Sequence, residues 1–503
     1  MLYKRIRYVV RFKGAYSEFF RALAGILIGD PASPALWNLF FADFFLAPHA
    51  DDVWLAGLHV PYLAQADDII LLSHSAAGLQ VKLDALLSWC ERNGLTINVL
   101  KSFVMVFGPL PAVRPHLSIR DTELPIVEST VYVGVTLTST ARNIFHAHRV
   151  AQAAKARKVA NAALGLESYL GRIPPQVART LYTARVDPHL VSACTIDLDV
   201  DAASLQPLKQ VQLTFVRRVL RLPAQSSVLA PLLDLGLWPL RYRRCHLAIA
   251  YARYLLTSPA QVPRAAFQAS VQLAVAGHPT WLTDLKHALA ALPCPVRFDY
   301  PWATMSVDHV DELSRALQAS LCAYVTEHVH TSRKLTVWQN ALLPLVPASA
   351  SPAALFTSAP YLVLADPEQR ANMSRLLAGI PPYAIEYLRR LAVPVEWRIC
   401  RLCRREGVIE DEQHVLFECP DPVLHTARHE MYAAIVATHP RWLRHRQRDN
   451  NWVFFGRALR DKDTVAMVAD FVAVTFQRCY AVPVVHIVSD EHLRRVTGAG
   501  RDM

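Results

Sequence analysis

Two adjacent carboxylates, Asp67 and Asp68, follow Ala66 between two strand-like runs, residues 59–65 and 69–73. This spacing places both at the tip of a predicted β-hairpin, where they can hold a divalent metal ion against phosphate oxygens. Successive residues of an extended chain point to opposite faces. We therefore expect Asp67 to be the direct metal ligand and Asp68 to support it. A solvated turn is the alternative for an isolated pair.

A loop that could approach a phosphate precedes this hairpin. Gly29 and Asp30 fall in a predicted tight turn, Ser33 is a suitable N-cap, and Pro34 is a suitable first residue for a helix over 35–46. Backbone donors at such a helix start can approach an anionic template or nucleotide. An ordinary loop-to-helix cap is the alternative. A second acidic pair, residues 51–52, is predicted to be a turn.

The last quarter of the chain carries four metal-ligating residues with the spacing C-x2-C-x10-H-x4-C: Cys400, Cys403, His414 and Cys419. Three thiolates and one imidazole make a full tetrahedral set for structural zinc. A helical turn over 415–418 would bring the second pair of ligands together. Reduced cysteines without metal are the alternative, and His425 and His429 are possible substitute ligands. The remaining cysteines are too scattered for a disulfide framework.

The net charge of +11 and the pI of about 9.3 favour an acidic partner such as nucleic acid. Basic and apolar residues alternate near the start of the chain, so that Arg7 and Arg11 are placed for a nucleic-acid backbone. Further basic clusters lie in predicted helices near residues 155–158, 217–221 and 241–244, where solvated faces are the alternative. The sequence has no long uncharged apolar run, and a basic amphipathic helix typical of a membrane surface does not stand out.

The pattern over residues 1–140 predicts an α+β fold in which strands from distant segments meet in one sheet. A helix is predicted over 77–92, ended by Asn93 and Gly94. Strands are predicted near 95–98, 102–107 and 130–137. From residue 141 to about 394 the pattern is mainly helical, and the composition of 348–360 predicts a loop or linker. One further apolar helix is predicted after residue 452.

These residues carry a resemblance to non-LTR retrotransposon (LINE-type) reverse transcriptases. Residues 25–39 resemble the segment that supports template and incoming nucleotide, and Ala66–Asp68 resembles the catalytic hairpin of the palm. Residues 93–102 resemble the next palm segment, and 132–135 the hairpin at the primer grip. The resemblance continues more weakly through 212–221 and 235–240. Such reading frames often end in a similar Cys-Cys-His-Cys knuckle.

The resemblance implies RNA-directed DNA polymerisation by two-metal nucleotidyl transfer, with Mg²⁺ or Mn²⁺ at Asp67 and Asp68 and with structural Zn²⁺ at the knuckle. It implies RNA and DNA as partners, and it lets Lys101 neutralise or protonate departing pyrophosphate. Gly29, Asp30, Ser33, Pro34, Arg7 and Arg11 would face template or nucleotide. Association with a complete reverse transcriptase is a further possible partnership, and no membrane partner is expected.

The sequence departs from the family at three points. Ile28 and Gln65 stand where many relatives carry Gln and an aromatic residue. The family's other metal-binding Asp and its fingers would precede Met1. We therefore expect an N-terminally truncated fragment or relic that is inactive as written. The alternative is a non-catalytic, zinc-stabilised nucleic-acid-binding protein, and a protein of the membrane surface comes third.

The expected organisation has five parts: a partial palm (1–140), a helical thumb and connection (141–347), a linker with a helical segment (348–394), the CCHC module (395–435) and a helical tail (436–503). Without a recognisable signal peptide or transmembrane segment, a nuclear or cytoplasmic location is expected.

Overall fold

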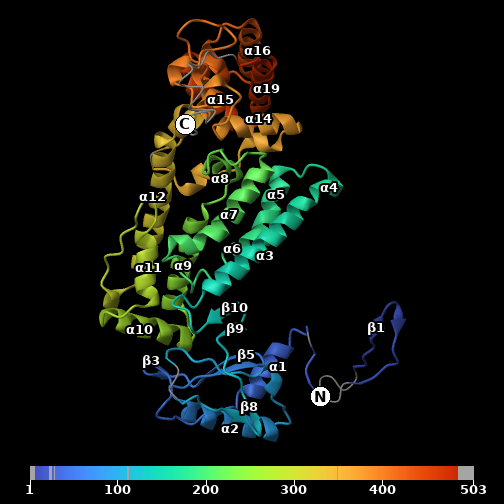
Figure 1. Cartoon of the computed structure of the whole chain (residues 1–503), viewed down its shortest axis with the longest axis vertical. Helices are drawn as coiled ribbons and strands as arrows, with labels where there is room; N and C mark the ends of the chain where they lie inside the picture. The colour runs from blue at the N-terminus through green and yellow to red at the C-terminus, as the bar shows by residue number, and fades with distance from the viewer. Residues whose placement is uncertain (1–5, 22–24, 28, 110–112, 348, 485–503) are drawn as a thin grey trace, which may run out of the picture. The chain divides into compact units, whose positions relative to one another are not determined.

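The computed structural model describes residues 6–21, 25–27, 29–109, 113–347 and 349–484. The chain divides into two compact units (Figure 1). Unit 1 comprises residues 1–145 and 258–272, and unit 2 comprises 146–257 and 273–503. The predicted α+β class is confirmed, because small antiparallel hairpins and two helices make up the first 145 residues and helices dominate the rest.

Unit 1 contains the following elements: β1 Arg11–Phe12, β2 Ala15–Tyr16, α1 Ser33–Phe41, β3 Trp54–Leu55, β4 Leu58–His59, β5 Tyr62–Gln65, β6 Asp68–Leu71, α2 Ala76–Arg92, η1 Val99–Lys101, β7 Ser118–Ile119, β8 Thr122–Glu123, β9 Ser129–Tyr132 and β10 Val135–Thr138. Helix α10, Gln261–Val275, crosses the division between the units.

The prediction of one shared sheet is wrong for the described residues. Their strands form five separate antiparallel hairpins, and each strand pairs only with its neighbour in sequence. The reason is local, because two-residue turns with positive φ close these hairpins, as at Ala66 and at Val133–Gly134. The predicted strand over 130–137 is therefore the hairpin β9–β10. Residues 95–98 and 102–107 form no regular strand, although Val104 makes an isolated parallel bridge with Ile126.

Helices α1 and α2 supply the apolar base of the carboxylate hairpin. Phe41 and Phe44, at and after the end of α1, pack edge-on against Trp89 of α2 in a buried cluster. The partly buried Ile69 and Leu71 of β6 pack on the same cluster. Helix α2 begins after Ser75, whose hydroxyl accepts a hydrogen bond from the Gly78 N–H at 3.0 Å, and its predicted extent is confirmed.

Helix α1 differs from its prediction at both ends. Ser33 lies inside the helix and does not cap it, because its hydroxyl donates to the Leu27 carbonyl at 2.6 Å. The Asp30 carboxylate accepts from the Ala32 N–H at 3.1 Å and shapes the preceding turn instead. The helix ends at Phe41 and not near residue 46, since the following residues turn so that Phe44 and Leu46 enter the core.

Unit 2 is helical throughout its described residues. Its longer helices are α3 His146–Gly165, α7 Ala202–Val219, α9 Leu240–Thr257, α11 Trp281–Ala290, α12 Val307–Thr331, α14 Pro367–Leu377, α16 Pro422–Thr438, α17 Arg441–Arg448, α18 Asn451–Arg460 and α19 Val465–Ala481. Shorter segments are α4 Glu167–Leu170, α5 Pro175–Leu181, η2 Tyr182–Val186, α6 Asp187–Leu190, α8 Ala230–Leu235, η3 Trp302–Thr304, η4 Trp338–Leu342, η5 Leu343–Leu345, α13 Pro352–Leu355, η6 Pro360–Val363, α15 Ala384–Arg390, η7 Val395–Trp397 and η8 His414–Glu418.

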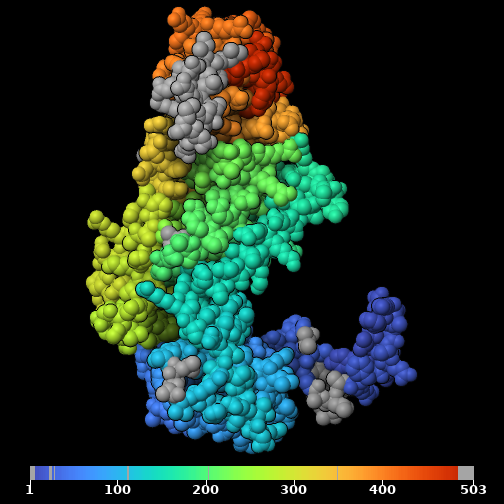
Figure 2. Space-filling model, in the orientation of Figure 1, coloured from blue at the N-terminus to red at the C-terminus, as the bar shows by residue number. Residues whose placement is uncertain are grey.

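One continuous buried core runs through unit 2. Helix α3 packs on α7, α9 on α12, and α16 on α19 (Figure 1). The space-filling view shows the helices of this unit in close contact from α3 to the C-terminal helices (Figure 2). The single apolar tail helix of the prediction is a pair of helices, α18 and α19. No helix among the described residues is long and apolar enough to cross a membrane.

Candidate functional site

The acidic pair lies where the sequence predicts it. In the hairpin β5–β6, Gln65 pairs with Asp68, so that Ala66 and Asp67 form the two-residue turn. Ala66 has φ of +54°, in the left-handed region that tight two-residue hairpin turns use at their first central position. The indole N–H of Trp37 in α1 donates to the Ala66 carbonyl at 2.7 Å. This hydrogen bond ties the tip to the helix that follows the Gly29–Asp30 loop.

The two faces of β6 differ in character. Ile69 and Leu71 face the buried cluster, so Asp68 and Ile70 face the other way by the two-residue period of a strand. Burial raises the pKa of Tyr132 in β9, and the nearby charge of Asp68 raises it further. Asp68 therefore lies close to the second hairpin, β9–β10. The side chains of Asp67 and Asp68 are exposed.

The other acidic pair has a structural role. The Asp52 carboxylate is 2% exposed, forms an ion pair with the buried Lys82, and hydrogen-bonds to His59. It also accepts from the His49 N–H at 2.8 Å. Burial acts to raise the pKa of Asp52, but these hydrogen bonds outweigh it and hold that pKa well below its usual range. Asp51 lies in the turn that the sequence predicts.

The remaining predicted residues of the nucleotide site are spread over unit 1. Arg11 lies in the exposed β1–β2 hairpin, and Arg7 precedes this hairpin. The Arg11 guanidinium lies 5.6 Å from the ring centre of Tyr16. Lys101 is exposed at the end of η1. Pro34 is the second residue of α1. Their proximity to a template or nucleotide stays a prediction.

The four residues of the zinc motif come together. The ligand atoms of Cys400, Cys403, His414 and Cys419 all lie within 4.8 Å of one another. The Cys400 and Cys419 sulfurs are 3.9 Å apart, and the Cys403 sulfur is 3.4 Å from His414 Nε2. Tetrahedral zinc with ordinary bond lengths would place two sulfurs about 3.8 Å apart and a sulfur and a nitrogen about 3.6 Å apart. The donor set therefore fits a tetrahedral ion of this size.

Two local structures present these ligands. Cys400 and Cys403 lie on a tight turn between the bridged residues Ile399 and Ile409. His414 begins the wide helical turn η8 and Cys419 directly follows its last residue, so that a helical turn joins these two ligands as the sequence predicts. His425 and His429 are not part of the cluster; they lie on α16, with His429 bonded to the His425 carbonyl.

Arg428 holds the second pair of ligands in place. This buried guanidinium donates to the carbonyls of Leu416 at 2.7 Å, Cys419 at 3.1 Å and Val415 at 3.2 Å. These are carbonyls that the end of a short helical turn otherwise leaves without partners. A hydrogen bond to Cys419, together with burial, raises the pKa of the Cys400 thiol to about 12. A divalent cation would instead favour thiolates at these positions.

Of the basic clusters, one member is structural. Arg244 is 2% exposed and paired with Asp199 at 2.9 Å, in a buried network that also joins Arg149 to Asp197 at 2.6 Å. Its charge is thus compensated inside unit 2. Arg217 donates to Ser226. A phosphate-binding role for the other cluster residues stays a prediction.

Sequence reasoning named Trp37 and Tyr132 only as members of segments that resemble the family, and it missed Arg428. The structure adds the contacts of these residues: Trp37 and Arg428 donate hydrogen bonds to backbone carbonyls, and Tyr132 lies near the charge of Asp68. No local signal marks the hydrogen bonds, because an indole or a guanidinium in a helix is usually a core or surface residue.

Comparison with known proteins agrees with this geometry. Residues 2–137 match the family model for reverse transcriptase (RNA-dependent DNA polymerase). The chain is also 29% identical over 139 residues to the retrovirus-related Pol polyprotein from type-2 retrotransposable element R2DM of Drosophila melanogaster. That match covers 26% of this chain and 13% of the relative. The chain therefore spans only a small part of that relative's length. Over residues 2–137 the chain is thus similar to the reverse transcriptase family, and the relative points to the non-LTR retrotransposon type.

Proposed function

We propose that unit 1 is the template- and primer-contacting part of a non-LTR reverse transcriptase palm, with Asp67 and Asp68 as its metal-holding carboxylates. The observation that carries this proposal is the fixed tip of β5–β6. Its turn is tied to α1 by Trp37, its apolar face is anchored on the aromatic cluster, and both carboxylates are exposed. An exposed acidic tip on a rigid base suits a ligand that arrives from solvent.

Each residue type has a definite part in such a site. Bound Mg²⁺ or Mn²⁺ would neutralise charge that develops on the transferred phosphoryl group. Asp67, in the turn, would offer its oxygens to the ion, and Asp68 would add negative charge beside Tyr132. The loop of Gly29 and Asp30 before α1, with Ser33 and Pro34, and the basic strand with Arg7 and Arg11 would contact the nucleic acid. Lys101 would serve the pyrophosphate.

We further propose that this 503-residue chain does not polymerise by itself. A two-metal clamp requires carboxylates from more than one backbone segment. Among the described residues, neither Asp67 nor Asp68 belongs to a group of three or more closely spaced metal-ligating side chains, whereas the cysteine–histidine cluster is such a group. The function of the chain alone is then nucleic-acid binding, supported by its net charge of +11. Catalysis would need a further carboxylate from an additional polypeptide segment.

Two assays on the purified chain test these statements. Incorporation of dNTPs on a primed RNA template with Mg²⁺ or Mn²⁺ should not exceed that of an Asp67→Ala variant. Binding of primed template should be saturable and should weaken steeply between about 50 and 200 mM salt. Extension above the variant would refute the inactivity proposal, and binding that ignores salt would refute the nucleic-acid role.

The chain provides a matched control for the acidic tip. Asp121 occupies the second position of the two-residue turn between β7 and β8, after Arg120 with φ of +53°. It therefore has the same local geometry as Asp67 after Ala66. If Asp67 holds a metal ion, Mn²⁺-induced line broadening in NMR spectra should be strongest near Asp67 and should disappear in Asp67→Asn. Asp121→Asn should leave it unchanged. Equal broadening at both turns would indicate that Asp67 is only a solvated turn residue.

We also propose that the cluster of Cys400, Cys403, His414 and Cys419 binds one structural zinc ion per chain. The fit of the sulfur and nitrogen separations to tetrahedral geometry supports this. Elemental analysis of the purified chain should give one equivalent of zinc. A metal-free chain whose folding is unchanged by a chelator would refute the proposal.

A further inference from the structure

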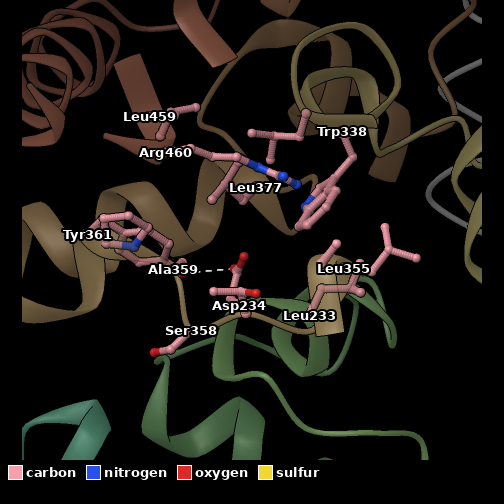
Figure 3. Close-up of a pocket in the computed structure, with 14 residues that line it drawn as sticks. Leu233, Asp234, Trp338, Leu355, Ser358, Ala359, Tyr361, Leu377, Leu459 and Arg460 are labelled. Carbon is pink, nitrogen blue, oxygen red and sulfur yellow. Dashed lines mark hydrogen bonds between the residues drawn. The ribbon is translucent and has the colours of Figure 1, made fainter. Parts of the chain in front are cut away.

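A cavity of about 180 Å³ lies within unit 2 (Figure 3). None of the residues that line it belongs to the cysteine–histidine cluster. Its walls come from α8, η4, the 354–361 segment, α14 and the end of α18. Five leucines give it a largely apolar surface: Leu233, Leu342, Leu355, Leu377 and Leu459. Exposed Ala354 and Thr357 also line it, so the cavity is reached from solvent. The sequence reads this segment as a linker, but here it forms one wall of a pocket.

An unused hydrogen-bond donor faces this cavity. The side chain of Trp338 is 3% exposed, and its indole N–H has no hydrogen-bond partner among the described residues. A buried polar group without a partner destabilises the fold, so a ligand that accepts this hydrogen bond would remove an existing cost. Figure 3 shows the indole nitrogen and the guanidinium of Arg460 on the same side of the space. A ligand oxygen placed there could accept from both.

Arg460 brings a positive charge into an apolar setting. Burial lowers the pKa of this guanidinium, and the charge of Asp234 acts in the opposite direction. Within the described part of the chain, no ion pair joins Arg460 to Asp234, and the indole N–H of Trp338 has no hydrogen-bond partner. Figure 3 shows the Asp234 carboxylate pointing into the same space from the opposite wall.

The environment of Asp234 favours the protonated form of its carboxyl group. It is 2% exposed, and one carboxylate oxygen accepts from the Tyr361 hydroxyl at 2.8 Å. Tyr361 also hydrogen-bonds to Ser374, at 3.1 Å. Burial raises the pKa of Asp234 to about 7, although Tyr361 and Arg460 act to lower it. Near neutral pH this carboxyl can carry its proton and add an O–H donor to the site.

We propose that this cavity binds a small monocarboxylate with a compact apolar body, of about the size of benzoate. Arg460 would pair with the carboxylate, Trp338 would donate to it, and the leucines would enclose the body. A guanidinium matches a carboxylate in a two-pronged geometry. A dry cavity of 150 Å³ in another protein accommodates benzene, so 180 Å³ suffices for a ring with one carboxylate. The surplus of donors over free acceptors argues for an anion and against a cationic or neutral amine ligand.

Benzoate is the probe for this site, and benzamide, of the same shape but uncharged, is its control. Isothermal titration calorimetry on the full chain should show one saturable benzoate site in the roughly millimolar range expected for a ligand of about nine non-hydrogen atoms. Benzamide should bind about tenfold more weakly or not at all. Absence of saturable benzoate binding, or equal affinity for the two compounds, would overturn the proposal.

Two variants locate the site. Arg460→Gln should weaken benzoate binding by about tenfold or more, whereas Lys462→Gln, which removes an exposed positive charge two residues later, should leave it unchanged. If Arg460→Gln does not fold, Asp234→Asn decides. The affinity of the wild type for benzoate should fall as pH rises through 7, because an ionised Asp234 repels the carboxylate of the ligand. In Asp234→Asn this dependence on pH should be absent. Identical pH profiles for the two proteins, or equal effects of the two charge-removing variants, would contradict the assignment.

Discussion

Replacement of Cys419 by Ser should unfold the local structure that the proposed zinc cluster would organise. Cys419 is fully buried, and its carbonyl is bound by Arg428. The adjacent turn carries Val415 and Leu416, both fully buried, and Phe417, 7% exposed, into the core of unit 2. Each such side chain contributes about 1.5–3 kcal/mol by burial. Together these three side chains contribute about 4.5–9 kcal/mol of packing, and this packing depends on a turn that is fixed at one end by the cluster.

The expected loss for Cys419→Ser follows from these quantities. Part of the packing survives because Arg428 and the core contacts remain, so we expect a local destabilisation of about 3–5 kcal/mol. A global melting temperature is a poor measure for a chain of 503 residues with two units. Hydrogen exchange of residues 400–419, with zinc content by elemental analysis, measures the effect directly. A chelator should produce the same local loss in the wild type.

A spectroscopic reporter lies beside the turn. The ring of Phe417 packs edge-on against Trp452 with centres 4.7 Å apart, so release of the turn should change the emission of this tryptophan. Cys294→Ser is the matched control, because this thiol lies in unit 2 outside the cluster. The control should keep one zinc and full exchange protection. If the backbone amides of residues 400–419 keep their protection from hydrogen exchange in zinc-free Cys419→Ser, the reasoning is refuted, because the core alone would then hold the turn.

Three further outcomes are expected. Asp52→Asn should destabilise unit 1 by about 3–5 kcal/mol, because Lys82 is left buried without its partner; hydrogen exchange of α2 measures this, and unchanged protection would contradict the buried ion pair. Trp37→Phe should cost the hairpin tip about 1 kcal/mol, seen as faster exchange at residues 62–71, by loss of the hydrogen bond to Ala66. The pKa of Asp234 in the folded chain is raised to about 7, above its pKa in the unfolded chain. Binding of the proton therefore stabilises the fold. This stabilisation is fully present at pH values below the unfolded-state pKa and is lost as pH rises toward 7. Asp234→Asn should remove up to about 4 kcal/mol of that pH dependence of unfolding, and equal dependence in both proteins would refute the shift.

The elements near the chemistry were predictable because their signals are local. The carboxylate turn follows from a two-residue acidic step between alternating runs, and helix α2 follows from its apolar period and from Asn93–Gly94 at its end. The C-x2-C and H-x4-C spacings bring their ligands together through short turns, so the cluster of Cys400 and Cys419 was predictable too.

Other expectations failed where a longer-range contact competes with a local preference. Ser33 is a good N-cap by type, yet its hydroxyl finds the Leu27 carbonyl instead. The shared sheet did not form in the described residues, because two-residue turns with positive φ close each hairpin on itself. The Pro- and Ser-rich stretch near 348–360 looks like a linker by composition, but Phe356 and Tyr361 are buried in the core.

The sequence by itself determined the acidic turn, the zinc-ligand spacing, the helical character of the later chain and the likeness to reverse transcriptases, since each rests on residues close together in the chain. Only the tertiary structure decided that Trp37 fixes the hairpin tip, that Asp68 lies near Tyr132, and that Asp234 and Arg460 face one cavity. Those relations join residues separated by up to a few hundred positions. Their geometry depends on how the apolar faces of whole helices pack, and local sequence preferences do not encode that packing.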